Sequence, residues 1–145
     1  MRYFWFVLFG IAILGGVVRF SDEVKTPTAA IHGYLLELEV ARTPEEQTRG
    51  LSGRESLAEN AGMLFVYERP SLPGFWMKEM NFPIDIIWIG SDKRIVDISE
   101  NIAPETFPQL FHPRVPAQYV LEVNAGWAKS HNISVGDQAI FYGIF

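Results

Sequence analysis

Met63-Leu64-Phe65-Val66-Tyr67 is an uninterrupted apolar run near the middle of the chain. A strand that is apolar on both faces is typical of the centre of a sheet, because neither face meets water. The run therefore predicts a central strand, and the rest of the domain is expected to assemble around it.

Alternating or apolar segments on both sides of this run predict six further strands. Short gaps with turn residues separate most neighbouring strands. The predicted strands are Leu36–Val40, Phe75–Met80, Ile84–Ile89, Arg94–Ser99, Ala117–Val123 and Gln138–Tyr142. Since Asn81-Phe82-Pro83 alone separates the second and third of these, we expect them to pair with each other.

The predicted helices are short. Thr43-Pro44-Glu45-Glu46 combines a capping box with a proline at the first helical position, and Gly50 can end the helix. A helical turn is predicted near Glu55–Glu59. A last helix is predicted over Ala125–His131, with Asn124 as its N-cap.

Together these elements predict a β-rich α+β fold, with a mainly antiparallel sheet of about seven strands and two or three short helices. A sheet of seven strands in so small a domain tends to curl, so a partly closed barrel is expected. Ile102–Pro116 is the exception to the short connections. It contains four prolines and shows no periodicity, which is typical of a lid or a binding loop.

The first twenty residues differ from the rest, since fifteen of them are hydrophobic. Tyr3–Val18 is uncharged and is flanked by Arg2 and Arg19. Its length suits an uncleaved membrane anchor or a cleaved signal peptide, with a buried helix as a third alternative. We therefore expect a signal peptide or anchor over residues 1–20, a tether over residues 21–30 and one globular domain over residues 31–145. The domain is then exported to the periplasm or the cell exterior, and residues 3–18 hold it to the inner membrane if they are not cleaved.

Composition excludes several kinds of chemistry. The 145 residues carry a formal net charge of −5, and the first twenty contribute two positive charges, so the remainder carries −7. This balance disfavours binding to nucleic acid or to an anionic membrane surface. The absence of cysteine excludes disulfides and thiol catalysis. Neither a metal-binding histidine spacing nor a nucleotide-binding glycine motif occurs, so no metal and no cofactor are expected.

Two carboxylates are candidates for chemistry. Asp85 interrupts the apolar strand Ile84–Ile89 and shares a face with Ile87 and Ile89, where an unpaired charge would cost several kcal/mol. It is either a functional acid or a structural carboxylate that forms an ion pair or caps a turn. Glu122 lies on the less apolar face of its own strand and is either a second functional acid or simply exposed to solvent. Two such groups can divide general acid and general base roles if they lie close together.

Three further residues are candidates for ligand binding. Trp76 and Lys78 are expected on one face of the strand Phe75–Met80, where they can stack on a sugar or hold an anion. The alternative is that Trp76 packs in the core and Lys78 is solvated. Arg54 follows a glycine-rich turn and can clamp a ligand carboxylate in bidentate fashion, or pair internally with Asp85.

An ordered set of motifs resembles the domain of unknown function 192 family over about Ile31 to Tyr142. The matching pieces are Arg49-Gly50-Leu51 with Arg54, Gly62-Met63-Leu64-Phe65-Val66, Trp76-Met77-Lys78, Pro83-Ile84-Asp85, Val120-Leu121-Glu122, Ala125-Gly126-Trp127 and Val135-Gly136-Asp137. The resemblance implies the same fold and an N-terminal signal or anchor, but no mechanism. In one place this chain departs from the family, which usually has Asn-Thr where Glu79-Met80 stand here.

Three functions remain open from the sequence. The first is a non-enzymatic extracytoplasmic domain that binds a small polar or carbohydrate-like ligand through Arg54, Trp76, Lys78, Asp85 and Glu122. The second is a membrane-tethered module that binds another protein through an apolar patch. The third is a hydrolase or lyase that uses Asp85 and Glu122 as a carboxylate pair.

Overall fold

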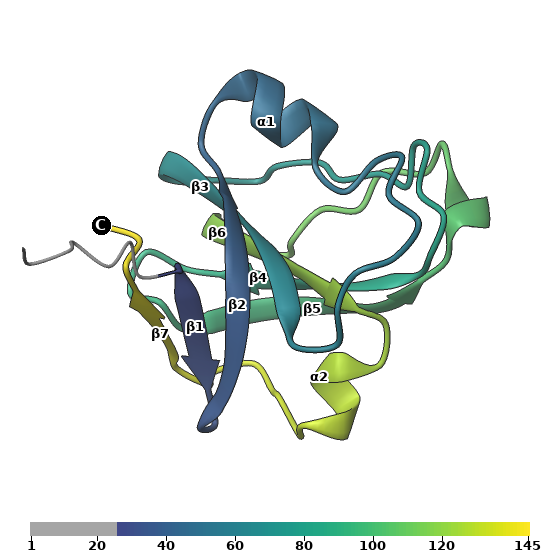
Figure 1. The fold of residues 1–145 in the computed structure, drawn as a ribbon. Coiled ribbons are helices and arrows are strands. Elements are labelled where there is room, and N and C mark those ends of the chain that lie inside the picture. The colour runs from purple at the N-terminus through teal and green to yellow at the C-terminus, as the bar shows by residue number, and fades with distance from the viewer. Residues whose placement is uncertain (1–25) are drawn as a thin grey trace, which may run out of the picture.

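The computed structural model describes residues 26–145, which form a single sheet with short helices around it (Figure 1). The strands are β1 (Thr28–Ile31), β2 (Tyr34–Ala41), β3 (Ala61–Ser71), β4 (Ile84–Ile89), β5 (Ile95–Ile102), β6 (Ala117–Asn124) and β7 (Ala139–Tyr142). The helices are α1 (Pro44–Arg49), α2 (Trp127–Ser130) and a 3-10 helix over Pro104–Thr106. The predicted signal peptide or anchor of residues 1–20 lies outside the described residues. Thr28–Ala30, assigned above to the tether, are part of β1.

The seven strands follow the order β5-β4-β6-β3-β2-β1-β7 and form a half-barrel. All neighbours are antiparallel except β2 and β3, which are parallel because α1 and the loop after it carry the chain back across the sheet. The two edge strands meet at one end, where the Ile95 N–H donates to the Asp137 carbonyl at 2.9 Å. A bridge between Arg94 and Gln138 lies beside this contact. The predicted β-rich fold and its partial closure are therefore confirmed.

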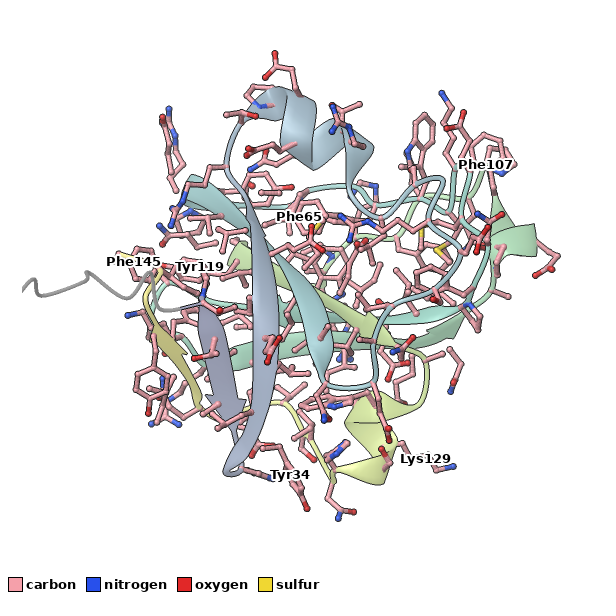
Figure 2. The ribbon with its side chains drawn as sticks, viewed as in Figure 1. Tyr34, Phe65, Phe107, Tyr119, Lys129 and Phe145 are labelled. Carbon is pink, nitrogen blue, oxygen red and sulfur yellow. The ribbon has the colours of Figure 1, made fainter. Side chains whose placement is uncertain are left out.

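Each face of the sheet packs its own apolar core. The inner core includes residues from both edges of the half-barrel and from the helix α2. Among its members are Leu36, Leu64, Ile87, Leu121, Val123 and Trp127. The outer core is covered by α1, the loop after it and the segment 72–83; it includes Met63, Phe65, Phe75, Met77, Ile86 and Trp88. Figure 2 shows Phe65 below α1 and Phe107 at the far end of the loops. The strand β4, which lies between β5 and β6, is consequently buried on both faces.

The prediction of a strand over Phe75–Met80 is wrong. Within this segment an isolated bridge from Phe75 to Phe111 is the sole β pairing, and a turn follows in which the Met80 N–H approaches the Met77 carbonyl at 3.3 Å. Proline and glycine just before the segment interrupt regular pairing, and both sides of β4 are taken by β5 and β6. The seventh strand of the sheet is β1 instead.

The structure confirms one helix prediction and corrects the other two. The capping box of α1 is confirmed, because the Thr43 side chain accepts from the Glu46 N–H and the Glu46 carboxylate accepts from the Thr43 N–H. The helical turn near Glu55–Glu59 does not form. Asn124 does not cap α2; its side-chain amide donates to the carbonyls of Leu57 and Ala58 at 3.0 and 3.1 Å, which holds this loop in its irregular path. Across residues 26–145, no helix is long and apolar enough to cross a membrane.

Candidate functional site

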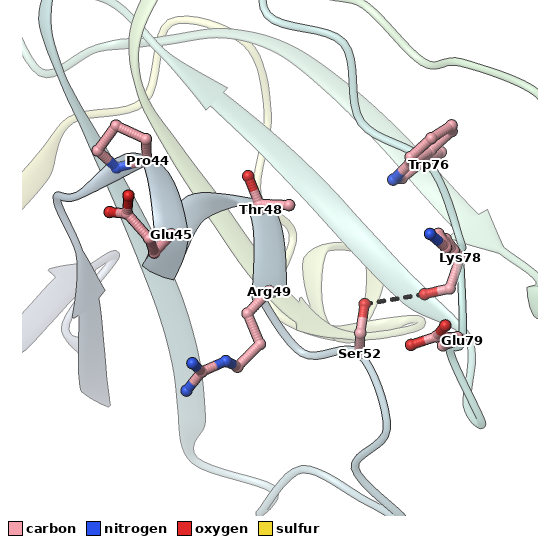
Figure 3. Close-up of a pocket in the computed structure, with 8 residues that line it drawn as sticks. All are labelled: Pro44, Glu45, Thr48, Arg49, Ser52, Trp76, Lys78 and Glu79. Atoms are coloured by element: carbon pink, nitrogen blue, oxygen red, sulfur yellow. Dashed lines mark hydrogen bonds between the residues drawn. The ribbon is translucent and has the colours of Figure 1, made fainter.

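An open cleft lies on the outer side of the sheet, between α1 and the segment 72–83. It consists of two adjoining hollows of about 470 and about 540 Å³, which share part of their lining. Figure 3 shows the outer hollow, with α1 on one side, Trp76 and Lys78 on the other and Ser52 between them. We call the two hollows together the α1 cleft. Their lining includes Thr48, Arg49, Ser52, Phe65, Tyr67, Phe75, Trp76, Lys78, Met80 and Glu122.

Glu122 lies at the inner end of the α1 cleft. It stands on β6, where its register partners are Met63 of β3 and Ile86 of β4, and its side chain is 6% exposed. Within residues 26–145 the oxygen Oε2 is buried and has no hydrogen-bond partner. Burial raises the pKa of Glu122 to about 8, although the positive charge of Arg54 opposes this shift. The carboxyl is therefore mostly protonated at neutral pH and can donate a hydrogen bond.

Tyr67 is a second polar group in the inner hollow. Burial, together with the nearby Glu122, raises the pKa of its hydroxyl to about 12. The hydroxyl therefore stays protonated under physiological conditions. Tyr67 follows Met63 and Phe65 at a spacing of two along β3, so alternation alone places it on the face of the outer core. The sequence analysis interpreted this run only as a central strand and overlooked Tyr67 as a site residue.

Trp76 and Lys78 form the outer rim of the cleft. Trp76 is 48% exposed, so the alternative that it packs in the core is wrong. The Lys78 ammonium lies 5.8 Å from the centre of the Trp76 ring, within the range of a cation–π contact. Trp76 also contacts the ring of Phe107, which comes from the long proline-rich loop, at a centroid distance of 5.5 Å.

Three hydrogen bonds join the loop after α1 to the segment that carries Trp76 and Lys78. The Ser52 hydroxyl donates to the Lys78 carbonyl at 2.8 Å, as drawn in Figure 3. The Gly53 N–H donates to the Glu79 carbonyl, and the Asn81 amide donates to the Arg54 carbonyl, both at 2.8 Å. The two sides of the α1 cleft are thereby held at a fixed separation.

Glu79 adopts a positive φ of 56°, a conformation in which asparagine is much more common than other residues with a side chain. This gives a backbone reason for the asparagine that the family usually has here. The departure noted in the sequence therefore concerns the shape of this turn. It does not remove Trp76 or Lys78 from the cleft.

Arg54 lies beside the cleft without lining it. Its guanidinium pairs in bidentate fashion with the Glu39 carboxylate, with one contact of 2.7 Å from Nη2 to Oε2. Hydrogen bonding to Arg54 lowers the pKa of Glu39. The expected pair between Arg54 and Asp85 is therefore wrong, because Glu39 occupies the guanidinium.

Asp85 faces the opposite side of the sheet. Its register partner is Val123, which belongs to the inner core, whereas Glu122 is opposite Ile86 of the outer core. The Asp85 carboxylate accepts hydrogen bonds from backbone N–H groups of Asn101, Gly126 and Ala128 at 2.8 to 3.1 Å. Asp85 thus holds α2 and the end of β5 in place, and the expected pair of Asp85 with Glu122 does not form.

The structure therefore brings Trp76, Lys78 and Glu122 to one cleft, places Arg54 next to it and separates Asp85 from it. Thr48 and Ser52 were not predicted as site residues. No sequence pattern distinguishes them from other exposed hydroxyl side chains, because the site arises where α1 folds over the sheet. In the part of the chain that the structure describes, no group of three or more potential metal-ligating residues comes together.

A half-barrel with two short helices and an open cleft beside α1 defines a small, β-rich α+β domain. Residues 27–141 match the DUF192 family, described as "Uncharacterized ACR". The chain belongs to this family, which confirms the resemblance noted in the sequence.

Two crystal structures are similar to this chain. One is of a protein of unknown function from Novosphingobium aromaticivorans DSM 12444, with 33% identity and a TM-score of 0.73 over 79% of this chain and 82% of that one. The other is of a putative transcription regulator from Sinorhizobium meliloti 1021, with 32% identity and a TM-score of 0.74 over 81% of this chain and 93% of that one. No curated protein matches the chain.

Proposed function

We propose that the protein is a non-enzymatic binding domain whose α1 cleft takes a small polar, carbohydrate-like ligand. The observation that carries this proposal is Glu122, a buried carboxyl at the inner end of the cleft whose oxygen Oε2 has no partner among residues 26–145. A buried polar atom without a partner is costly, and a ligand hydroxyl next to the carboxyl would remove that cost.

The lining of the cleft supports a ligand with both an apolar face and several hydroxyl groups. Trp76 offers an exposed aromatic surface on which a sugar ring can stack. Thr48 and Ser52 border the same space, and Tyr67 lies further in. A cleft with mostly apolar walls and a few polar groups is the usual form of a small-molecule site.

The structure gives no support to the hypothesis of a hydrolase or lyase that uses Asp85 and Glu122 as a pair. The two carboxyls project from opposite faces of the sheet. They cannot act together on one substrate bound in the α1 cleft.

A protein-interaction module is the second candidate function. It is supported by apolar side chains that remain exposed next to the cleft, among them Leu72, Phe107 and Leu110. Exposed apolar residues gathered in one place often mark a protein interface. Under this alternative the partner would cover the cleft rim, and small molecules would not bind.

The location of the domain is part of the proposal. The apolar segment over residues 3–18 supports export to the periplasm or the cell exterior, with the segment acting as an anchor if it is not cleaved. Fractionation of cells that express the full chain tests this. Recovery of the protein in the cytosol would contradict export.

Binding is tested by thermal shift and isothermal titration with a panel of monosaccharides, short oligosaccharides, nucleotides and organic acids. A bound ligand raises the melting temperature by mass action. Replacement of Trp76 by alanine should abolish binding of the ligand that emerges. Replacement of Tyr142, an equally exposed aromatic residue on β7, should leave binding unchanged. If no sugar binds, or if Trp76→Ala binds normally, the proposal is wrong.

A further inference from the structure

We infer that the ligand of the α1 cleft is an acidic saccharide, with its carboxylate against Lys78 at the rim and neutral hydroxyls toward Glu122. This inference rests on the proposed function and specifies the class of sugar. It comes from the way in which charge is distributed along the cleft.

Lys78 supplies a positive charge beside the stacking surface. Its ammonium lies 5.8 Å from the Trp76 ring centre, and its backbone carbonyl is fixed by the Ser52 hydroxyl. No carboxylate in the described part of the chain forms an ion pair with it, whereas Arg54 and Arg114 are paired with Glu39 and Asp97. A sugar ring that stacks on Trp76 would therefore place a carboxylate substituent within reach of an uncompensated cation.

The inner end of the cleft does not repel such a ligand. Glu122 is mostly protonated at neutral pH, because burial raises its pKa to about 8, and the Tyr67 hydroxyl is neutral too. Both groups can hydrogen-bond to uncharged hydroxyls. The cleft thus has a neutral inner end and a positive charge at the Trp76 side of its rim.

The other charged residues of the outer hollow are Glu45, Arg49 and Glu79, and within residues 26–145 neither carboxylate forms an ion pair with Lys78. Figure 3 shows Glu45 on α1, across the hollow from Trp76 and Lys78, and the guanidinium of Arg49 directed away from both. Glu79 follows Lys78 in the chain without forming an ion pair with it within residues 26–145. The cation in contact with the Trp76 ring is therefore Lys78, and it has no ion-pair partner within residues 26–145.

The test compares neutral sugars with their acidic counterparts by isothermal titration at low salt: D-glucose with D-glucuronate, and D-galactose with D-galacturonate. We expect at least one acidic member to bind about two- to fivefold more tightly than its neutral counterpart, as one partly exposed charge pair would give. The preference should shrink at high salt, because the pair lies at the rim.

Two lysine variants locate the source of the preference. Lys78→Met should bring the acidic sugar to the affinity of the neutral one. Lys129→Met removes an exposed lysine of α2, outside the cleft, and should preserve the preference. Equal binding of neutral and acidic sugars by the native protein, or a preference that survives Lys78→Met, would overturn this inference and leave the proposed function intact. Absence of binding by every sugar would overturn both.

Discussion

Glu122 keeps its carboxyl where water has little access and where no protein group replaces the lost hydration at Oε2 within the described residues. A charged carboxylate in such a place is unfavourable, so the side chain retains its proton over a much wider pH range than an exposed glutamate. Asp85 is equally buried, yet three backbone N–H groups satisfy its carboxylate. The two acidic side chains lie on neighbouring strands, yet they differ in whether surrounding protein groups hydrogen-bond to their buried oxygens.

The protonation of Glu122 predicts a pH-dependent stability. Its pKa is about 8 in the folded protein against an ordinary value of 4.5. Between these values the folded state binds more protons than the unfolded state, so the free energy of unfolding falls as pH rises from about 4.5 to about 8. Glu122→Gln has no such titration. We expect the free energy of unfolding of this variant, relative to that of the native protein, to rise by on the order of 4 kcal/mol over this range.

Urea denaturation at pH 5, 7 and 9 measures this difference. Glu59→Gln, which changes an exposed glutamate, serves as the control and should follow the native protein at every pH. Parallel pH profiles for Glu122→Gln and the native protein would show that Glu122 ionises normally.

At the scale of elements, α2 is too short to be stable by itself and depends on its attachment to the sheet. It has no side-chain cap of its own; the N–H groups of Gly126 and Ala128 donate to Asp85 of β4 instead. The same carboxylate accepts from the Asn101 N–H at the end of β5. One side chain therefore joins a helix, a central strand and an edge strand.

Removal of this carboxylate should loosen all three elements together. We expect Asp85→Ala to lower the free energy of unfolding by about 3 kcal/mol, since one buried and two partly buried N–H groups lose their acceptor. Equilibrium denaturation measures the loss, with the exposed Glu59→Ala as control. Ligand binding in the α1 cleft should be unchanged, because Asp85 lies on the other face of the sheet. A loss below about 1 kcal/mol would contradict the anchoring role.

At the scale of the whole molecule, the half-barrel is strongest in its centre and weakest where its edges meet. The strand β6 pairs along its length with both β3 and β4. The edges β5 and β7 touch through one bridge and a few backbone hydrogen bonds near Ile95 and Ala139. We therefore expect local unfolding to occur more readily at the contact between β5 and β7 than in the centre of the sheet.

Amide hydrogen exchange should reveal this gradient. The amides of Ile95 and Ala139 are hydrogen-bonded across the closure and should exchange at least roughly tenfold faster than that of Leu121 in β6. Exchange followed by NMR under native conditions measures the difference. Equal protection of the three amides would mean that the barrel opens as one cooperative unit.

Much of the fold could be predicted from local patterns. The run at Met63–Tyr67 lies in the central strand β3, and Thr43–Glu46 forms the predicted capping box. Phe75–Met80 was misassigned because its alternation arises from burial of Phe75 and Met77 in the outer core without regular strand pairing. Alternation reports which side chains are buried, and it does not report whether the backbone finds a neighbour.

The candidate site could be predicted less completely. Trp76, Lys78 and Glu122 were chosen because an aromatic residue beside a lysine and a carboxylate in a strand suggest binding chemistry. These three residues share a cleft from which Asp85 is excluded. This arrangement follows from the register of β4 against β6 and from the path of the loops over the sheet. Both depend on contacts between residues far apart in the chain.

The sequence by itself determined the family, the β-rich architecture and the chemical character of the candidate residues, because these follow from residue type and local periodicity. The tertiary structure alone decided which carboxyl is satisfied and which is not. Asp85 and Glu122 both interrupt apolar strands, and burial costs each of them the same hydration. Asp85 recovers it from backbone N–H groups brought in by α2 and β5, whereas the loops that cover Glu122 supply no partner to its Oε2 and leave an open cleft beside it.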